Sequence, residues 1–157
     1  MPKPSPQWMP ARSDLSTAFA IQRKDSLVES VVAACAAVAY ADGRVTPEER
    51  RRVLAAIRGS DVLAIFSAAE VKHRFDEAVD RFERDGAAAE RRALEQVAGL
   101  KALRKEARHL VAACYAVAAA DLHVDGEERA LVRRVCELVG VDPAEIDAAD
   151  VEPVPAA

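Results

Sequence analysis

One stretch of the chain occurs twice, and this internal repeat constrains the fold more than any other feature of the sequence. Residues 30–57 align without a gap with residues 109–136, at an offset of 79 residues that takes Cys35 to Cys114 (114 − 35). In each copy an Ala-rich apolar run is followed by one Asp, then a Val, then Glu-Glu-Arg. Self-similarity at a fixed offset indicates a repeat architecture, and two copies suit a pseudo-symmetric pair rather than a solenoid.

The first part of each copy predicts a buried helix. From Val28 to Ala39, apolar residues recur at the spacing of one helical face, and the positions between them are mostly Ala. A helix that is apolar nearly all round belongs in the centre of a domain. The uncharged run Val31–Ala41 has 11 residues, whereas a bilayer crossing needs roughly 20, so we expect a core helix here.

The second part of each copy predicts a capped amphipathic helix. Thr46 is a good N-cap, Pro47 suits the first helical position, and Glu49 completes a capping box. In the second copy Asp125 and Glu128 supply the same device. Each copy therefore predicts a helical hairpin with a short turn.

Length and composition extend this prediction to the whole chain. A chain of 157 residues is large enough for one domain with a sizeable core. Hydrophobic residues make up 51% but aromatic residues only 4%, so small side chains let helices approach closely. We predict an all-α, internally duplicated helical-hairpin bundle of about seven helices with a pseudo-twofold axis. The single domain is placed at residues 13–149, between a disordered Pro-rich tail (1–12) and a frayed tail (150–157).

Local signals predict the remaining helix boundaries. Ser13 and Asp14 are expected to cap a short helix that ends near Arg23, and Asp25 or Ser26 to cap the first repeat helix.

The middle of the chain and its C-terminal part carry cap signals of their own. Ser67 with Glu70 predicts another capping box, and Asp142 is expected to cap a final short helix. The middle helix should bury Val71, Phe75, Ala78, Val79 and Phe82. Its Glu–Arg and Asp–Arg pairs four residues apart, such as Glu70 with Arg74, are interpreted as a solvated face.

Net charge bears on the kind of partner, and cysteine usage indicates the compartment. A net charge of −4 gives no reason to expect nucleic acid as a partner. Cys35, Cys114 and Cys136 lie on apolar helix faces without metal-ligand spacing, which is typical of free thiols in a reducing compartment. No signal peptide is apparent, so we expect a cytoplasmic protein.

The acidic residues of the two hairpin turns are the candidate site. Asp42 and Asp121 each close a buried helix at its C-terminal end, where the helix dipole disfavours negative charge. Glu49 and Glu128 lie in first helical turns, where capping already accounts for them. Together with helix-end carbonyls these four carboxylates would form an all-oxygen cluster that suits Ca²⁺, Mg²⁺ or Mn²⁺. Both readings, turn and cap residues or a divalent-cation site, stay open.

The residues at the ligand positions exclude an EF-hand calcium-binding loop. Placing Gly43 at the sixth loop position puts Val38 and Tyr40 at the first and third positions, where side-chain oxygens are needed. The second copy has Leu122 in place of this glycine. His123 could add a nitrogen ligand beside Asp121, although its counterpart is Arg44 and an exposed turn histidine is the simpler interpretation.

No phosphate loop, catalytic triad or nucleophile elbow is visible in the sequence, so we expect a protein that is not an enzyme. A hydrolase that uses the turn carboxylates is a minor alternative. A second alternative is direct handling of a metal or metalloid by acidic or thiol ligands. Apolar burial of the thiols speaks against the thiol version, because it raises thiol pKa values and lowers reactivity.

At the level of the whole pattern the sequence resembles the tellurite-resistance TerB family. The resemblance rests on Asp42-Gly-x-Val with Glu49-Arg after the Ala-rich helix, on its repetition from Asp121 to Glu128, and on the late Val-Gly-Val-Asp-Pro-Ala-Glu segment. It covers residues 13–147. It implies an all-helical, duplicated bacterial domain with a role in resistance to tellurite and other stresses.

The resemblance also implies partners and a site. Proteins of this family are thought to join membrane-associated complexes with a TerC-type integral-membrane protein and TerD-type calcium-binding proteins. We therefore expect a cytoplasmic adaptor, associated with the inner face of the cell membrane through a partner. Asp42, Glu49, Asp121 and Glu128 match the family's proposed metal-binding positions, although Leu122 departs from the family pattern in the second turn. The oligomeric state is left open.

Overall fold

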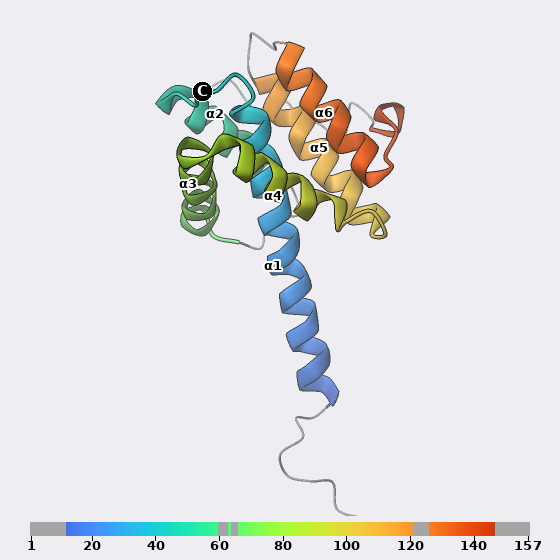
Figure 1. The fold of residues 1–157 in the computed structure, drawn as a ribbon. Helices are drawn as coiled ribbons and strands as arrows, with labels where there is room; N and C mark the ends of the chain where they lie inside the picture. Colours follow the sequence, from blue (N-terminus) through green and yellow to red (C-terminus); the bar gives the residue numbers. More distant parts are fainter. Residues whose placement is uncertain (1–11, 60–62, 64–65, 121–125, 147–157) are drawn as a thin grey trace, which may run out of the picture.

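The computed structural model describes residues 12–59, 63, 66–120 and 126–146, and all regular elements in them are helical (Figure 1). The elements in chain order are α1 (Arg12–Ala39), α2 (Pro47–Arg58), α3 (Ala68–Arg84), α4 (Gly86–Ala98), α5 (Arg104–Ala120), α6 (Gly126–Val139) and the short 3-10 helix η2 (Pro143–Glu145). The predicted all-α class is confirmed. Within the described residues there are six α-helices, so the expected number of about seven, the duplication and the pseudo-twofold axis remain interpretations of the sequence.

The first helix is longer than predicted. α1 is one continuous helix of 28 residues, so the expected break near Arg23 and the new cap at Asp25 or Ser26 were wrong. No Gly or Pro interrupts this segment, and the Ser30 hydroxyl donates to the Ser26 carbonyl at 2.8 Å, a bond that serine makes inside helices. The tails predicted at 1–12 and 150–157 lie outside the described residues, except Arg12, which begins α1.

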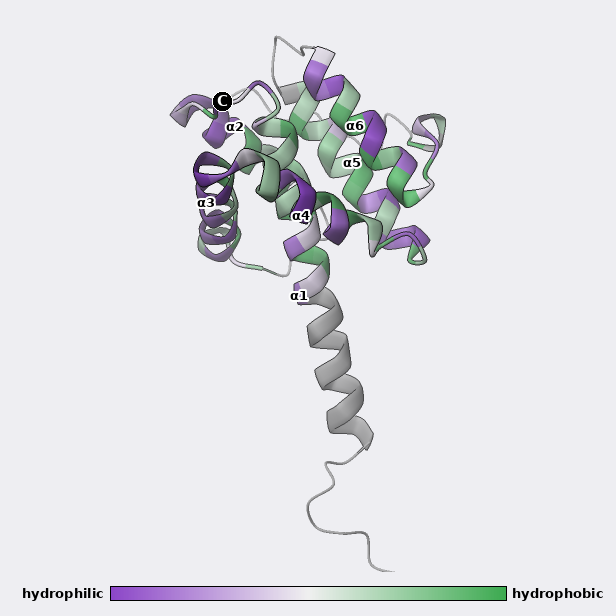
Figure 2. Cartoon of the chain, in the orientation of Figure 1, coloured by the Kyte–Doolittle hydropathy of each residue, from purple (hydrophilic) through white to green (hydrophobic). Residues whose placement is uncertain are grey.

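The C-terminal part of α1 is the centre of the domain, as predicted. Every residue from Val31 to Ala39 is buried, and α1 contacts each of the other five α-helices. Figure 1 shows α3 on one side of this part of α1 and α5 and α6 on the other, while α4 crosses α1 from the side of α3 to the side of α6. Hydrophobic residues dominate α1 inside the body, whereas α3 presents many hydrophilic residues in the same view (Figure 2).

The caps of α2, α3 and η2 are the predicted residues, whereas Asp125, the predicted cap of α6, lies outside the described residues. At α2 the capping box is complete, since the Thr46 hydroxyl accepts from the Glu49 N–H at 3.2 Å and the Glu49 carboxylate accepts from the Thr46 N–H at 2.7 Å. At α3 Ser67 accepts from the Glu70 N–H at 3.1 Å, but the Glu70 side chain lies 3.6 Å from Arg74 instead of closing the box. Asp142 caps η2 as expected.

The helix α3 buries the five residues predicted for it, Val71, Phe75, Ala78, Val79 and Phe82. Its charged face is more than a solvated surface. Arg74 forms ion pairs with Glu29 at 3.0 Å and Asp25 at 3.3 Å, both on α1. Its guanidinium also lies 5.8 Å from the centroid of the Phe66 ring. Because these groups come from different elements, Arg74 fixes the position of α3 against α1.

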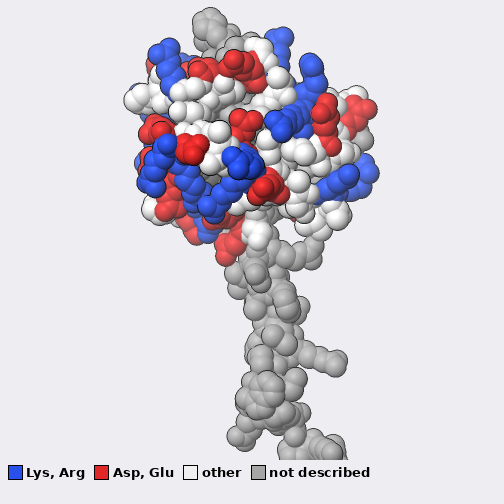
Figure 3. All heavy atoms as spheres, in the orientation of Figure 1, with Lys and Arg blue, Asp and Glu red and all other residues white. Residues whose placement is uncertain are grey.

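A second charged contact joins α3 to α2. Asp76 accepts from Arg50 of α2 at 2.7 Å and from Lys72 at 2.6 Å. Burial raises the pKa of Asp76, but the hydrogen bonds and positive charges of Lys72 and Arg50 outweigh this, so that its pKa is lowered overall. Elsewhere on the body, charged side chains of both signs are intermixed (Figure 3).

This contact makes stability depend on pH through Asp76. A lowered folded-state pKa contributes stability that is present above the unfolded-state value of about 3.9 and is lost as the pH falls through the folded value. Asp76→Asn is therefore expected to lower the free energy of unfolding at pH 7 by about 1 kcal/mol, with a difference that shrinks towards about pH 3. Urea titrations at both pH values check this, with Glu77→Gln as the exposed control on the same helix. A deficit of equal size at both pH values would contradict the ionic origin.

Among the described residues, no helix combines the length and apolar character needed to cross a membrane.

Candidate functional site

The first acidic turn follows the end of α1. Gly43 has φ of +92°, a backbone conformation that favours glycine. Its N–H donates to the Tyr40 carbonyl at 2.8 Å. Asp42 is exposed, and its carboxylate accepts from the Arg44 N–H at 3.2 Å. Asp42 thus has a structural role as a turn residue, of the kind aspartate fills through hydrogen bonds to nearby backbone.

Glu49 is also engaged locally. One of its carboxylate oxygens accepts from the Thr46 N–H in the capping box of α2. No group of three or more His, Cys, Asp or Glu side chains within the described ranges is arranged to hold a metal ion. The carboxylates of Asp42 and Glu49 each use one oxygen in these backbone hydrogen bonds. The described residues could therefore supply at most some of the oxygen ligands of a cation. Metal binding at the first turn stays a prediction.

The second acidic turn is only partly described. Asp121 and His123 lie outside the described residues. Glu128, in the first turn of α6, is only 7% exposed. A buried carboxylate is stabilised at this position by the positive end of the helix dipole, as expected for a residue equivalent to Glu49. The sequence did not predict that Glu128 would be buried.

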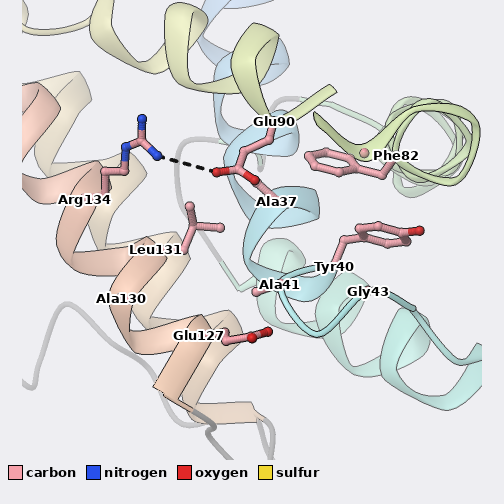
Figure 4. Close-up of a pocket in the computed structure, with 11 residues that line it drawn as sticks. Ala37, Tyr40, Ala41, Gly43, Phe82, Glu90, Glu127, Ala130, Leu131 and Arg134 are labelled. Carbon is pink, nitrogen blue, oxygen red and sulfur yellow. Dashed lines mark ion pairs between the residues drawn. The ribbon is translucent and has the colours of Figure 1, made fainter. Parts of the chain in front are cut away.

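The C-terminal end of α1, the turn that follows it and α6 line one groove with a volume of about 410 Å³ (Figure 4). Its lining comes from α1 and the following turn, from the junction of α3 and α4, and from α6: Ala37, Tyr40, Ala41, Gly43, Phe82, Gly86, Glu90, Glu127, Ala130, Leu131 and Arg134. Gly43 adjoins Asp42, and Glu127 adjoins Glu128. The sequence left open whether the two acidic turns share one end of the bundle, and this groove brings their flanking residues together.

The walls of the groove differ in character. On one side the rings of Tyr40 and Phe82 lie with centroids 5.4 Å apart. A Cβ atom added at Gly86 would meet the Tyr40 ring at 3.5 Å, an ordinary contact distance, so the start of α4 runs close beside this ring. On the other side Leu131 projects from α6 (Figure 4). The aromatic wall therefore faces an aliphatic one.

Charged side chains flank this apolar centre. Glu90 of α4 and Arg134 of α6 form an ion pair at 3.6 Å. Glu127 lies nearer the Gly43 turn, separated from that pair by Leu131 and Ala130 (Figure 4). Glu127 has the sequence position equivalent to Glu48, and this was the sole sequence signal for its place near the turns. The rest of the groove was missed because its lining comes from helices far apart in the chain.

The three cysteines are buried and free, as predicted. A hydrogen bond with the thiol of Cys35, followed by burial, raises the pKa of Cys114 well above its ordinary value. Burial also raises the pKa of Cys136, which a hydrogen bond with Tyr115 lowers in part. Raised pKa values leave little thiolate, the reactive form, at neutral pH. Cys114 and Cys136 thus combine low exposure with low reactivity.

Fold and site together define a class: an all-α domain in which the capped α1–α2 hairpin carries an acidic turn beside a groove of mixed apolar and charged character. Comparison with known families is consistent with this class. The family model described as Tellurite resistance protein TerB matches residues 29–151, and the chain belongs to this family.

A curated relative points to the same family. It is a protein of an Alcaligenes species named Tellurium resistance protein TerB, and it is 30% identical to this chain over 74 residues. The alignment covers 47% of this chain and 61% of the relative, so it spans less than two thirds of either protein. No solved structure matches the chain.

Proposed function

We propose that this protein is a non-enzymatic component of a bacterial tellurite- and stress-resistance system, acting as a cytoplasmic adaptor in a membrane-associated complex. Membership of the TerB family supports the resistance role. The observation that supports the adaptor role is the groove where the two hairpins meet. Its charged side chains flank an apolar centre, an arrangement typical of sites that recognise another protein through an anchor residue and a polar rim.

The proposed partners follow from the family resemblance. They are a TerC-type integral-membrane protein and a TerD-type calcium-binding protein. Association with the membrane would then be indirect, through the TerC-type protein.

We expect expression of the chain in a tellurite-sensitive bacterial strain lacking its own TerB to restore growth on tellurite, together with the other resistance genes. After crosslinking in those cells, the chain should be recovered with the TerC-type protein in the membrane fraction. Cells that lack the TerC-type gene but are otherwise identical are the control, and there the chain should stay out of the membrane fraction. Restored growth without any such association would contradict the adaptor role.

The proposal includes a divalent cation at the acidic turns, held by Asp42, Glu49, Asp121 and Glu128. What supports it is that Gly43 and Glu127, which adjoin Asp42 and Glu128, line one groove. Carboxylate clusters of this kind suit Ca²⁺, Mg²⁺ or Mn²⁺. A bound cation would neutralise like charges and hold the two turns together. The conformation of this end of the groove would then depend on the bound metal.

Calorimetric titration of Ca²⁺, Mg²⁺ and Mn²⁺ tests this part of the proposal. We expect saturable binding by the parent protein and its loss in the double variant Asp42→Asn/Asp121→Asn. The double variant Asp80→Asn/Glu95→Gln makes the same change of charge at exposed positions of α3 and α4 and should bind like the parent. Circular dichroism of all three proteins reports whether helicity is kept. Equal binding by both double variants would place the cation elsewhere.

An alternative function is direct handling of a metal or metalloid by the thiols. The contact of Cys35 with Cys114 is the observation in its favour. Burial of all three cysteines weighs against it, because a ligand could reach them only through local opening of the helices. Loss of resistance in a folded Cys35→Ala/Cys114→Ala variant would favour this alternative over the adaptor.

A further inference from the structure

We propose that the groove between the two hairpins binds a segment of a partner protein that inserts an apolar side chain and places a lysine or arginine beside Glu127. This inference deepens the adaptor function proposed above and rests on it. It identifies the groove as the surface that contacts the partner, and it states which kinds of side chain the partner supplies.

The shape of the groove favours an inserted side chain. Ala37, Ala41 and Ala130 contribute only methyl groups to its lining, so its floor stays open between larger neighbours. The Tyr40 and Phe82 rings stand on one side, and Leu131 stands on the other (Figure 4). A volume of about 410 Å³ lies within the range of sites that bury most of a bound group. An aliphatic or aromatic anchor would thus be enclosed on both sides.

The charges of the groove favour a cation next to that anchor. The ion pair between Glu90 and Arg134 balances one negative and one positive charge. Glu127 is the remaining ionisable carboxylate of the lining. Asp42 and Arg44 flank the lining residue Gly43 and balance each other, so Glu127 leaves the lining with one net negative charge. The groove therefore carries an excess of negative charge on the side of the hairpin turns. An acidic partner would be repelled there, whereas a lysine or arginine would be attracted.

The arrangement suits a segment of protein chain. Anchor and cation sites are offset along α6, with Leu131 one turn after Glu127. Side chains four residues apart on a bound helix lie on one face with a similar offset, so one short helix could supply both groups.

The test uses a phage-displayed library of helix-forming peptides selected against the intact protein. We expect the enriched peptides to carry an apolar residue with a lysine or arginine three or four positions away. Ala130→Trp, which fills the groove from an exposed position of α6, should abolish their binding. Ala55→Trp places the same side chain on the exposed face of α2 and should leave it unchanged. Thermal unfolding shows that both variants fold.

A matched pair of neutral variants isolates the charge. Glu127→Gln should weaken binding of the selected peptides by about threefold, as expected for one exposed ion pair. Glu137→Gln, on the same helix but outside the groove, should have no effect. Enrichment of acidic peptides, no enrichment at all, or equal binding by Ala130→Trp would overturn the proposal. So would self-association of the parent that Ala130→Trp removes, because the groove would then hold a second copy of this chain.

The same variants separate this inference from the adaptor function. If the selected peptides bind the groove as described but Ala130→Trp still restores growth on tellurite, the groove chemistry stands and its role in resistance fails. If Ala130→Trp abolishes resistance while no basic peptide is selected, the adaptor function stands and the assigned partner chemistry is wrong.

Discussion

Phe75→Ala is expected to lower the free energy of unfolding by about 3–5 kcal/mol, the largest effect we predict for one substitution. Phe75 is fully buried in α3 and is the largest such side chain among the described residues. Its removal loses apolar burial and leaves a cavity. The core is built mainly from Val, Ala and Leu, with only four Phe in the whole chain. Few neighbours are therefore long enough to fill the space.

Chemical denaturation checks this value, and the midpoint of thermal unfolding should fall by roughly 10 °C for a chain of this length. His73→Ala is the control, because His73 lies on the same helix with its side chain 74% exposed. We expect its effect to stay within about 0.5 kcal/mol. A loss below about 2 kcal/mol for Phe75→Ala would mean that α3 can move inward to fill the cavity, against the tight packing inferred here.

Ala36→Leu is expected to destabilise the fold by about 1–3 kcal/mol, although it adds hydrophobic surface and keeps a good helix former. Ala36 is fully buried in the part of α1 that contacts the surrounding helices. Small side chains at such positions let helix backbones approach closely. A larger side chain must push a neighbouring helix away or adopt a strained rotamer, because protein interiors are close-packed.

The matched control is Ala55→Leu, the same substitution on the exposed face of α2. It should change the free energy of unfolding by only a few tenths of a kcal/mol. Urea titration of both variants beside the parent measures the difference. An Ala36→Leu protein as stable as the parent would show that the centre of the domain holds unfilled space, contrary to the role we assign to its alanines.

Some local features of the chain were predictable to the residue. Thr46 and Glu49 stand three positions apart, so the capping box of α2 forms within one turn and needs no other element. The five buried residues of α3 follow directly from helical periodicity. The same local reasoning failed at Glu70, because Arg74, itself held by two acidic residues of α1, attracts its carboxylate away from the cap. A tertiary contact thus overrode a local signal.

The candidate site shows the same difference between features set by neighbouring residues and features set by tertiary contacts. Asp42 and Glu49 were found from the sequence, and the structure gives each of them a backbone hydrogen bond inside its own turn or helix start. The aromatic pair of Tyr40 and Phe82 and the ion pair of Glu90 with Arg134 were not found. Each joins residues more than 40 positions apart in the chain, where no spacing rule applies.

The sequence by itself determined the helical class, the buried centre of α1, the capping box of α2 and the first acidic turn, because each depends on residues within a few positions of one another. Only the tertiary structure decided that α1 runs unbroken into the domain, and that Arg74 and Asp76 tie α3 to its neighbours. It also decided that Gly43 and Glu127 line one groove. These features depend on how helices pack, and packing is set by the shapes and charges of surfaces that meet only after the chain has folded.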